Sequence, residues 1–237
     1  MREMPSICHT PLTLTVFIAA EMIVSPLYIV APQRAKGKNT MRIHEGEQAF
    51  GFHVQDIWDT PVNLTDYAGK YVLLSFFRFA SCPYCNLRVH RMIGRYEAYR
   101  EKGMEMLAIF ESPNQTMRRY VGKEQAPFPI IGDPTNQLYQ VYGLEKSWRK
   151  VFKTFITPKS LLATVREGLY ATFVKGFWPG KIDAGVHRMP ADFLIGPDQI
   201  VKKAYYGNYP GDHLPFEEID QLVETWPVRP MERALVP

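Results

Sequence analysis

Apolar and polar residues follow strand and helix periods along most of the chain beyond Met41. Val72–Phe77 is a nearly continuous apolar run, which predicts a strand covered on both faces of a sheet. Met104–Phe110 has the same character. Between the two runs, apolar residues recur with helical spacing up to about Arg100, and Glu101-Lys102-Gly103 is typical of a helix end. Strand, helix and strand in this order predict a parallel crossover.

The same alternation continues toward the carboxyl end. Next come a helix, a short strand and a short helix, at Asn114–Glu124, Pro129–Gly132 and Asn136–Tyr142. The last third predicts two strands joined by a turn and then an amphipathic helix, at Asp192–Ile195, Ile200–Tyr206 and Pro215–Thr225. Glu47–Gln55 alternates well enough for a further short strand before the central one. The pattern as a whole predicts an α/β domain.

Glu145–Lys175 differs from its surroundings because it is rich in Lys and Arg, and it predicts one or two amphipathic helices. Seven of its apolar side chains could line one helical face: Trp148, Phe152, Phe155, Leu162, Val165, Leu169 and Phe173. We interpret the segment as a helical insertion that packs on the edge of the domain, with a membrane-surface helix as the alternative. The domain is expected at residues 41–226, followed by a tail at 227–237.

The amino-terminal segment is apolar but irregular. Leu12–Ala31 is long enough to cross a membrane, yet Glu21 lies at its middle and Pro26 interrupts it. It also lacks the clear cleavage site of a signal peptide. We therefore expect residues 1–40 to be a dispensable tail and expect no membrane partner. The alternatives are translation from Met41, a membrane anchor and a cleaved export signal.

Composition narrows the function only slightly. With 28 basic and 24 acidic residues the 237-residue chain has a net charge of +4, and 46% of it is hydrophobic. This is an ordinary globular composition, and so small a charge does not indicate a nucleic-acid partner. Three cysteines exclude a disulfide-framework protein. So few cysteines suit a reducing cytoplasm, with the periplasm as an alternative.

Cys82-Pro83-Tyr84-Cys85 lies where the central strand gives way to the helix. This spacing lets both sulfurs meet within one helical turn, so a disulfide can form and break without unfolding the domain. The amino end of a helix also favours a thiolate, which is the reactive form of cysteine. We expect Cys82 to be the accessible sulfur and Cys85 the sheltered one. A single Cys-x-x-Cys lacks the second ligand pair of a zinc site, so no metal is expected.

The motif and its surroundings resemble the peroxiredoxin-like (AhpC/TSA-type) branch of the thioredoxin superfamily. The resemblance spans roughly Glu47 to Val223 and rests on five segments: Asp66–Leu73, Phe76-Phe77-Arg78, the cysteine motif, Met189–Asp198 and Gly211-Asp212-His213. It implies a thioredoxin-like α/β/α sandwich with a central mixed sheet and a helical insertion before a cis-proline strand. It also implies a thiol–disulfide redox enzyme acting on hydroperoxides or disulfides, with no cofactor and a thioredoxin- or glutathione-type electron donor.

The same resemblance assigns roles around the dithiol. Pro190 would be the superfamily's cis-proline facing the cysteines, and it would present the backbone of Met189 to a substrate. Without the resemblance, Pro190 is an ordinary trans proline at the start of a strand. The Pro83-Tyr84 pair also resembles glutaredoxins, and by that likeness Tyr84 would contact a glutathione-type substrate. Arg188 would supply a positive charge near the sulfurs, although an arginine in such a place is more often at the surface.

Two mechanisms remain open, and they differ in the attacking sulfur. In a disulfide reductase, Cys82 attacks the substrate and Cys85 resolves the mixed disulfide. In a peroxidase, Cys85 is oxidised to a sulfenic acid and Cys82 condenses with it. Arg78 stands where peroxiredoxins carry a proline and Cys82 where they carry a threonine, so the peroxide-holding set is incomplete. A non-catalytic binding module on the same fold is the third alternative.

Overall fold

The computed structural model describes residues 28–30 and 42–225 of the chain. Apart from Tyr28–Val30, the expected amino-terminal tail therefore lies outside the described residues, and so does the expected tail at 227–237. The described chain builds one five-stranded sheet and one small three-stranded sheet.

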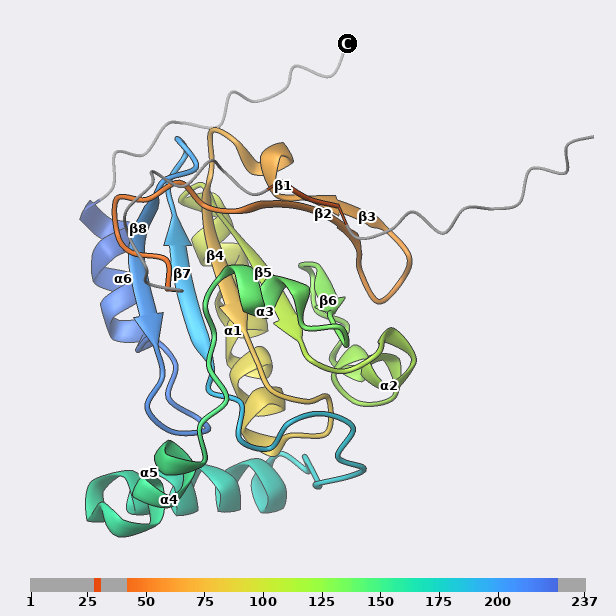
Figure 1. Cartoon of the computed structure of the whole chain (residues 1–237), viewed down its shortest axis with the longest axis vertical. Coiled ribbons are helices and arrows are strands. Elements are labelled where there is room, and N and C mark those ends of the chain that lie inside the picture. The colour runs from red at the N-terminus through yellow and green to blue at the C-terminus, as the bar shows by residue number, and fades with distance from the viewer. Residues whose placement is uncertain (1–27, 31–41, 226–237) are drawn as a thin grey trace, which may run out of the picture.

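The five-stranded sheet has the strand order β6-β5-β4-β7-β8 (Figure 1). Its strands are β4 Tyr71–Phe76, β5 Met104–Phe110, β6 Ile130–Gly132, β7 Ala191–Ile195 and β8 Val201–Tyr206. β4, β5 and β6 are parallel because helices return the chain between them. β7 is antiparallel to β4, and β8 is antiparallel to β7. The sheet is therefore mixed, as the resemblance implied.

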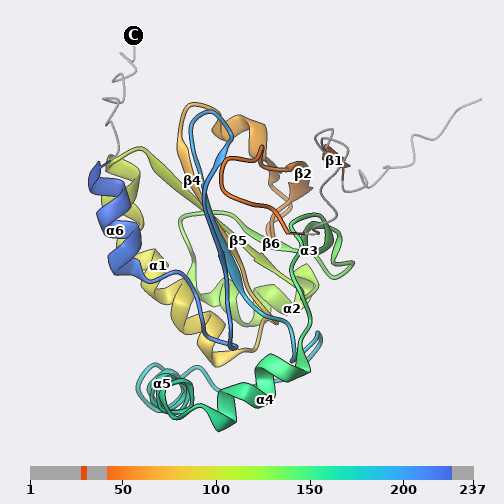
Figure 2. The ribbon, with the colours of Figure 1, turned by 60° about the vertical axis from the view of Figure 1, so that its left-hand side comes forward.

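Both faces of this sheet are covered. Helices α1 (Pro83–Glu101) and α6 (Phe216–Thr225) cover one face, while α3 (Gln137–Val141) and the β2–β3 hairpin cover the other (Figure 2). Neighbouring side chains of β4 enter the two layers in turn: Leu73 packs on the α1 side and Leu74 on the opposite side. This confirms the predicted central strand and the α/β/α layering.

A smaller sheet contributes to the second layer. β2 (Gly51–Gln55) pairs antiparallel with β3 (Pro61–Asn63), and a 3-10 turn follows at Leu64–Tyr67. β1 (Tyr28–Val30) pairs with the other edge of β2. Three residues of the segment expected to be a tail are therefore part of the fold.

Most predicted elements of the α/β core are present, with ends that differ by one residue or less. One exception is the helix predicted at Asn114–Glu124. It consists of α2 (Asn114–Arg119) and a 3-10 turn at Val121–Glu124. Tyr120 separates them because its backbone leaves the helical region, with φ −114° and ψ −92°.

The insertion forms two helices between α3 and β7. They are α4 (Trp148–Ile156) and α5 (Pro158–Leu169), and a π-helical turn at Tyr170–Val174 extends α5. The break falls at Pro158 because proline fits the first turn of a helix but cannot continue one. Figures 1 and 2 both place the two helices beyond the end of the sheet at which α1 begins.

The insertion does not pack on the domain in the way the sequence predicted. Phe152, Phe155 and Phe173 are 63%, 62% and 69% exposed. The fully buried positions of the insertion are instead the small residues Thr154 and Ala171. In the part of the chain that the structure describes, no helix has both the length and the apolar character needed to cross a membrane.

Candidate active site at the amino end of α1

Cys82 and Cys85 lie where the chain leaves β4 and begins α1. Cys82 is the N-cap residue and has extended backbone, and Pro83 occupies the first helical position. The side-chain amide of Asn86 fixes this turn by donating to the carbonyls of Ala80 and Cys82, at 2.8 and 2.9 Å. Both cysteines are free thiols, and the Cys85 thiol forms a hydrogen bond with the Cys82 sulfur. The two sulfurs therefore meet within one helical turn, as predicted.

Arg78 places a positive charge against Cys82. Its Nη1 atom lies 3.8 Å from the Cys82 sulfur. The side chain is itself buried, its guanidinium lies over the ring of Phe79, and Nη2 donates to the carbonyl of Val186. A cation held in this way next to a sulfur stabilises the thiolate, because the charge is little screened by water.

The two thiols differ in acidity. Burial alone would raise the pKa of Cys82, but the hydrogen bond with Cys85 and the charge of Arg78 lower it to about 6. Backbone amides at the helix start contribute to this lowering of the pKa. Burial raises the pKa of Cys85 well above its ordinary value, and the neighbouring Cys82 sulfur adds to the rise. Near neutral pH, Cys82 is therefore the thiolate and Cys85 the thiol that donates to it.

Both sulfurs are covered, so the expectation that Cys82 is accessible is wrong. Each cysteine is 1% exposed. The segment Lys181–Val186, hereafter the covering segment, is attached beside them. Ser81 Oγ donates to the carbonyl of its first residue at 2.8 Å, and Arg78 donates to the carbonyl of its last. Two apolar side chains of the segment pack against the core cluster that contains the cysteines. Because the Cys82 sulfur is buried, an external substrate can reach it only when neighbouring groups move.

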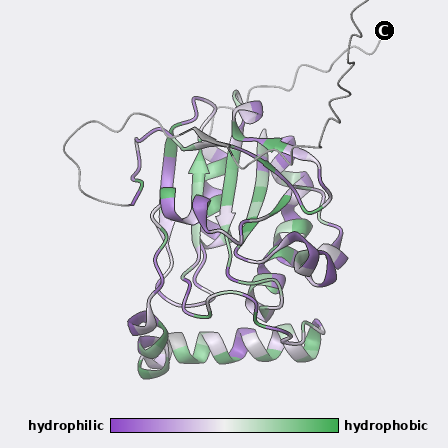
Figure 3. Cartoon of the chain, turned by 45° about the vertical axis from the view of Figure 1, so that its right-hand side comes forward, coloured by the Kyte–Doolittle hydropathy of each residue, from purple (hydrophilic) through white to green (hydrophobic). Residues whose placement is uncertain are grey.

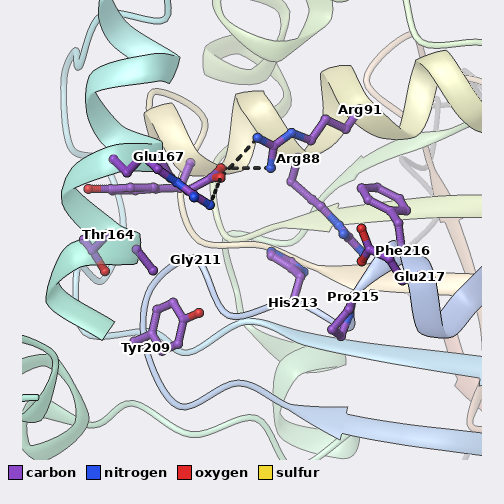
Figure 4. A pocket seen from close by; sticks show the side chains of 13 residues that line it. Arg88, Arg91, Thr164, Glu167, Tyr209, Gly211, His213, Pro215, Phe216 and Glu217 are labelled. Atoms are coloured by element: carbon purple, nitrogen blue, oxygen red, sulfur yellow. Dashed lines mark hydrogen bonds and ion pairs between the residues drawn. The ribbon is translucent and has the colours of Figure 1, made fainter. Parts of the chain in front are cut away.

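A recess of about 240 Å³ lies beside Tyr84, between α1, α5 and the loop that precedes α6 (Figure 4). Three arginines line it: Arg88, Arg91 and Arg166. Two carboxylates, Glu167 and Glu217, also line the recess, and Glu167 pairs with Arg91 at 2.8 Å, so three arginines against two glutamates leave one net positive charge. The Tyr84 ring packs on Gly168 so closely that a Cβ there would lie 2.7 Å from the hydroxyl oxygen. The predicted contact residue Tyr84 thus joins the recess to the cysteine motif.

A buried contact between a histidine and an aspartate supports the floor of the same region. His213 lines the recess, and its Nδ1 lies 3.0 Å from the carboxylate of Asp192 on β7. Burial alone would raise the pKa of Asp192, but the charges of His213 and Arg88 outweigh burial and lower it to about 2. The carboxylate also accepts the amide of Leu214 at 2.7 Å, which ties β7 to the loop before α6. Nε2 of His213 has no hydrogen-bond partner among the described residues.

Met189 and Pro190 lie at the entry to β7 and are both buried. The described residues contain no cis peptide bond, so the expected cis-proline at position 190 is wrong. The carbonyl of Pro190 accepts the amide of Gly207 at 2.9 Å, and the amide of Met189 donates to Glu145 at 3.3 Å. These bonds hold the segment as a trans strand entry, and they leave the Met189 amide unable to pair with a substrate.

Arg188 is 4% exposed, so the interpretation as a surface arginine is also wrong. Its guanidinium lies 3.0 Å from the carboxylate of Glu111 and donates to the carbonyl of Leu144. Burial alone would raise the pKa of Glu111, but Arg188 and Lys146 lower it. Arg188 therefore balances a buried carboxylate, and the cation at the sulfur is Arg78.

Sequence reasoning missed three features of this site. Arg78 was noticed only as a departure from the peroxiredoxin pattern, although its place four residues before Cys82 was a usable signal. The Asp192–His213 pair and the covering segment join positions far apart in the chain, and no local pattern marks them. No cluster of three or more metal-ligating side chains occurs within residues 28–30 and 42–225.

Known proteins provide a comparison for this arrangement. The model of the AhpC/TSA family matches residues 46–204. The thiol-disulfide oxidoreductase ResA of Halalkalibacterium halodurans is 32% identical over 100 residues, covering 42% of this chain and 56% of ResA. Peroxiredoxin Bcp of Escherichia coli K12 is 28% identical over 105 residues, covering 44% of this chain and 67% of Bcp. The chain thus spans little more than half the length of the first relative.

A solved structure extends the comparison to the fold. Peroxidoxin BcpB of Mycobacterium tuberculosis superposes with a TM-score of 0.53 at 14% identity, over 77% of this chain and 96% of BcpB. The family match runs from just before β2 into β8, and it includes Arg78 and both cysteines. The chain belongs to the AhpC/TSA family and has a thioredoxin-like fold.

Proposed function

We propose that the protein is a thiol–disulfide oxidoreductase in which Cys82 attacks the substrate and Cys85 resolves the product. The observation that carries the proposal is the asymmetry at the helix start. Arg78 and the Cys85 thiol both point at the Cys82 sulfur, and they lower its pKa to about 6. A thiolate at neutral pH is the species that thiol–disulfide exchange requires. An idle Cys-x-x-Cys in a binding module would not need it.

With a disulfide substrate, the reaction has two exchanges. The Cys82 thiolate attacks one sulfur of the substrate, forms a mixed disulfide and releases the other sulfur as a thiolate. Cys85 then loses its proton and attacks the Cys82 sulfur, which releases the second substrate thiolate. The Cys82–Cys85 disulfide that remains holds two oxidising equivalents. The high pKa of Cys85 keeps it protonated until Cys82 has lost its negative charge.

A hydroperoxide is the second candidate substrate, and the similarity to peroxiredoxin Bcp favours it. The Cys82 thiolate would attack the terminal oxygen, break the O–O bond and become a sulfenic acid while the alkoxide leaves and takes a proton. Cys85 would then condense with the sulfenic acid and release water. This assignment reverses the sequence-based peroxidase mechanism, in which Cys85 attacks, because the cation and the lowered pKa belong to Cys82.

Either cycle ends in the same disulfide, which must be reduced by an external thiol. The recess beside Tyr84 carries three arginines and adjoins the motif. Its positive charge supports an acidic thiol of the glutathione type as the donor in preference to a neutral thiol. We propose a reducing compartment, the cytoplasm, as the location, because the dithiol must return to its reduced form.

Two serine variants test the order of attack. Cys85→Ser is expected to accumulate a mixed disulfide on Cys82 when mixed with a disulfide substrate, and mass spectrometry would identify it. Cys82→Ser is expected to lose both disulfide reduction and peroxide consumption in stopped-flow assays. If Cys82→Ser still consumed peroxide while Cys85→Ser did not, Cys85 would be the attacking sulfur and the proposal would be wrong.

A further inference from the structure

Exposed apolar side chains are concentrated in the insertion. Thirteen large hydrophobic residues are exposed in the described part of the chain, and all but Trp58 lie between Trp148 and Ile182. On α4, Trp148, Phe152 and Phe155 follow helical spacing. On α5 and its extension the series is Leu162, Val165, Leu169 and Phe173. We call these seven residues the apolar face of the insertion.

The insertion exposes its large apolar side chains to solvent, which is the reverse of an ordinary amphipathic helix. Its buried side chains are Thr154 and Ala171, which are small. Polar links also attach it: Lys150 donates to the carbonyl of Gly207, and Glu167 pairs with Arg91 on α1. In a globular protein the apolar stripe normally faces the core. Figure 3 shows green, hydrophobic bands along the helices at the lower edge, away from the strands of the sheet.

The same part of the chain has a large excess of basic over acidic residues. Residues 148–182 contain 7 of the 28 basic residues and 1 of the 24 acidic ones, so the remainder has 21 basic and 23 acidic residues. The net charge is therefore +6 over residues 148–182 and −2 over the rest of the chain. Arg149, Lys153 and Lys175 are exposed, and no carboxylate of the described residues pairs with them. Apolar and cationic groups thus share one surface.

We propose that the apolar face docks on an anionic lipid bilayer, with the two helices lying in the interface. Helices of this type have Trp, Phe and Leu on one side and Lys or Arg beside them, and anionic lipids attract them. A second copy of the chain fits less well, because a symmetric interface would bring two +6 segments together. A protein interface would also be expected to have a core poor in lysine.

Docking in this way has a consequence for the dithiol. Gly168 of α5 packs directly on Tyr84 of the cysteine motif. Because α5 would rest on the bilayer, the amino end of α1 would lie next to the membrane surface. The docking surface does not include either cysteine or the recess, so binding to lipid and redox activity can be measured separately.

Flotation of the full-length protein with vesicles tests the proposal. The probes are vesicles of phosphatidylcholine alone and of phosphatidylcholine with added phosphatidylglycerol. The wild type is expected to bind the anionic vesicles and to lose about tenfold in binding at high salt or with neutral vesicles. The double variants Phe152→Gln with Phe155→Gln, and Arg149→Gln with Lys153→Gln, are each expected to bind about tenfold less.

Trp58→Gln is the matched control, because Trp58 is 58% exposed but lies outside the insertion. It is expected to bind like the wild type. The proposal is overturned if the wild type does not bind anionic vesicles, or if all variants bind equally, which would place binding elsewhere, for example in Leu12–Ala31. A third result would also overturn it: the wild type is a dimer, it does not bind vesicles, and the double variant Phe152→Gln with Phe155→Gln is a monomer. Unchanged thermal unfolding and disulfide reduction in every variant would show that these outcomes report on docking alone.

Discussion

The start of α1 and the insertion place their side chains in opposite ways. At the start of α1, Cys82 and Cys85 are 1% exposed although their chemistry requires an outside molecule. In the insertion, Phe152 and Phe155 are more than 60% exposed although their chemistry favours burial. The difference in exposure corresponds to a difference in the role of each region. Within the buried site, the charge of Arg78 and the hydrogen bond between the thiols make their acidities unequal, whereas exposure leaves the insertion free to contact a partner.

The largest expected effect is on the reaction. Cys82→Ser should reduce the rate of disulfide reduction by a factor of about 1000 or more, because removal of a nucleophile leaves little residual catalysis. Phe152→Gln should leave the rate toward a water-soluble disulfide unchanged. Steady-state assays of both variants make the comparison. A comparable loss in the two variants would mean that the insertion takes part in the chemistry.

Substitutions in the two regions should also differ in their effect on the free energy of unfolding. Asp192→Asn removes the buried carboxylate that contacts His213 and accepts the Leu214 amide, and it is expected to cost about 2–3 kcal/mol of unfolding free energy. Phe152→Gln removes an exposed side chain and should change it by about 0.5 kcal/mol or less. Urea denaturation measures both. Equal costs would show that the insertion contributes to the core.

The lowered pKa of Asp192 also predicts how the free energy of unfolding changes at acid pH. Because the pKa of Asp192 in the folded state is about 2, below that of the unfolded chain, its ionised form stabilises the fold. This contribution is present above about pH 4 and is lost as the pH falls toward 2, amounting to about 2 kcal/mol. Unfolding free energies measured across this range should fall less in Asp192→Asn than in the wild type.

Arg78 should matter for reactivity more than for substrate binding. In Arg78→Gln the charge beside the Cys82 sulfur is lost, so the pKa of Cys82 should rise and its alkylation rate at pH 6 should fall about tenfold. Arg78→Lys keeps the charge and should restore part of the rate. Iodoacetamide labelling followed by mass spectrometry provides the readout. An unchanged rate in Arg78→Gln would show that Arg78 does not lower the pKa of Cys82.

The smallest expected effect concerns the covering segment. Ser81→Ala removes the bond from Ser81 Oγ to the carbonyl of Lys181. A hydrogen bond of this kind contributes about 1 kcal/mol, so the segment should open several-fold more often and alkylation of Cys82 should accelerate to the same extent. The pKa of Cys82 should not change. A slower reaction would indicate that the cover is held in another way.

The fold was predictable because its signals are local. Val72–Phe77 is apolar except for Ser75, and such a run is typical of a strand buried on both faces. The cysteine spacing likewise fixed the meeting of the two sulfurs, since a helical turn is rigid. These features depend on neighbours in the chain, and the structure confirms them.

The site was less predictable because its decisive contacts are long-range. The covering segment beside Cys82 comes from residues about one hundred positions later, and Arg188 pairs with Glu111 across 77 positions. Periodicity showed that Phe152 and Phe155 share a face, but it could not show that the face points away from the domain. The cis-proline expected from the resemblance at Pro190 is absent, and the hydrogen bond of that residue to Gly207, after β8, is likewise a long-range contact.

The most direct test of the account is the pH dependence of alkylation at each cysteine of the reduced wild-type protein, assigned by mass spectrometry. The account predicts that Cys82 reacts with a midpoint near pH 6 and that Cys85 stays unreacted well above neutral pH. A midpoint for Cys82 at the ordinary thiol value of about 8.5, or reaction of Cys85 before Cys82, would contradict it.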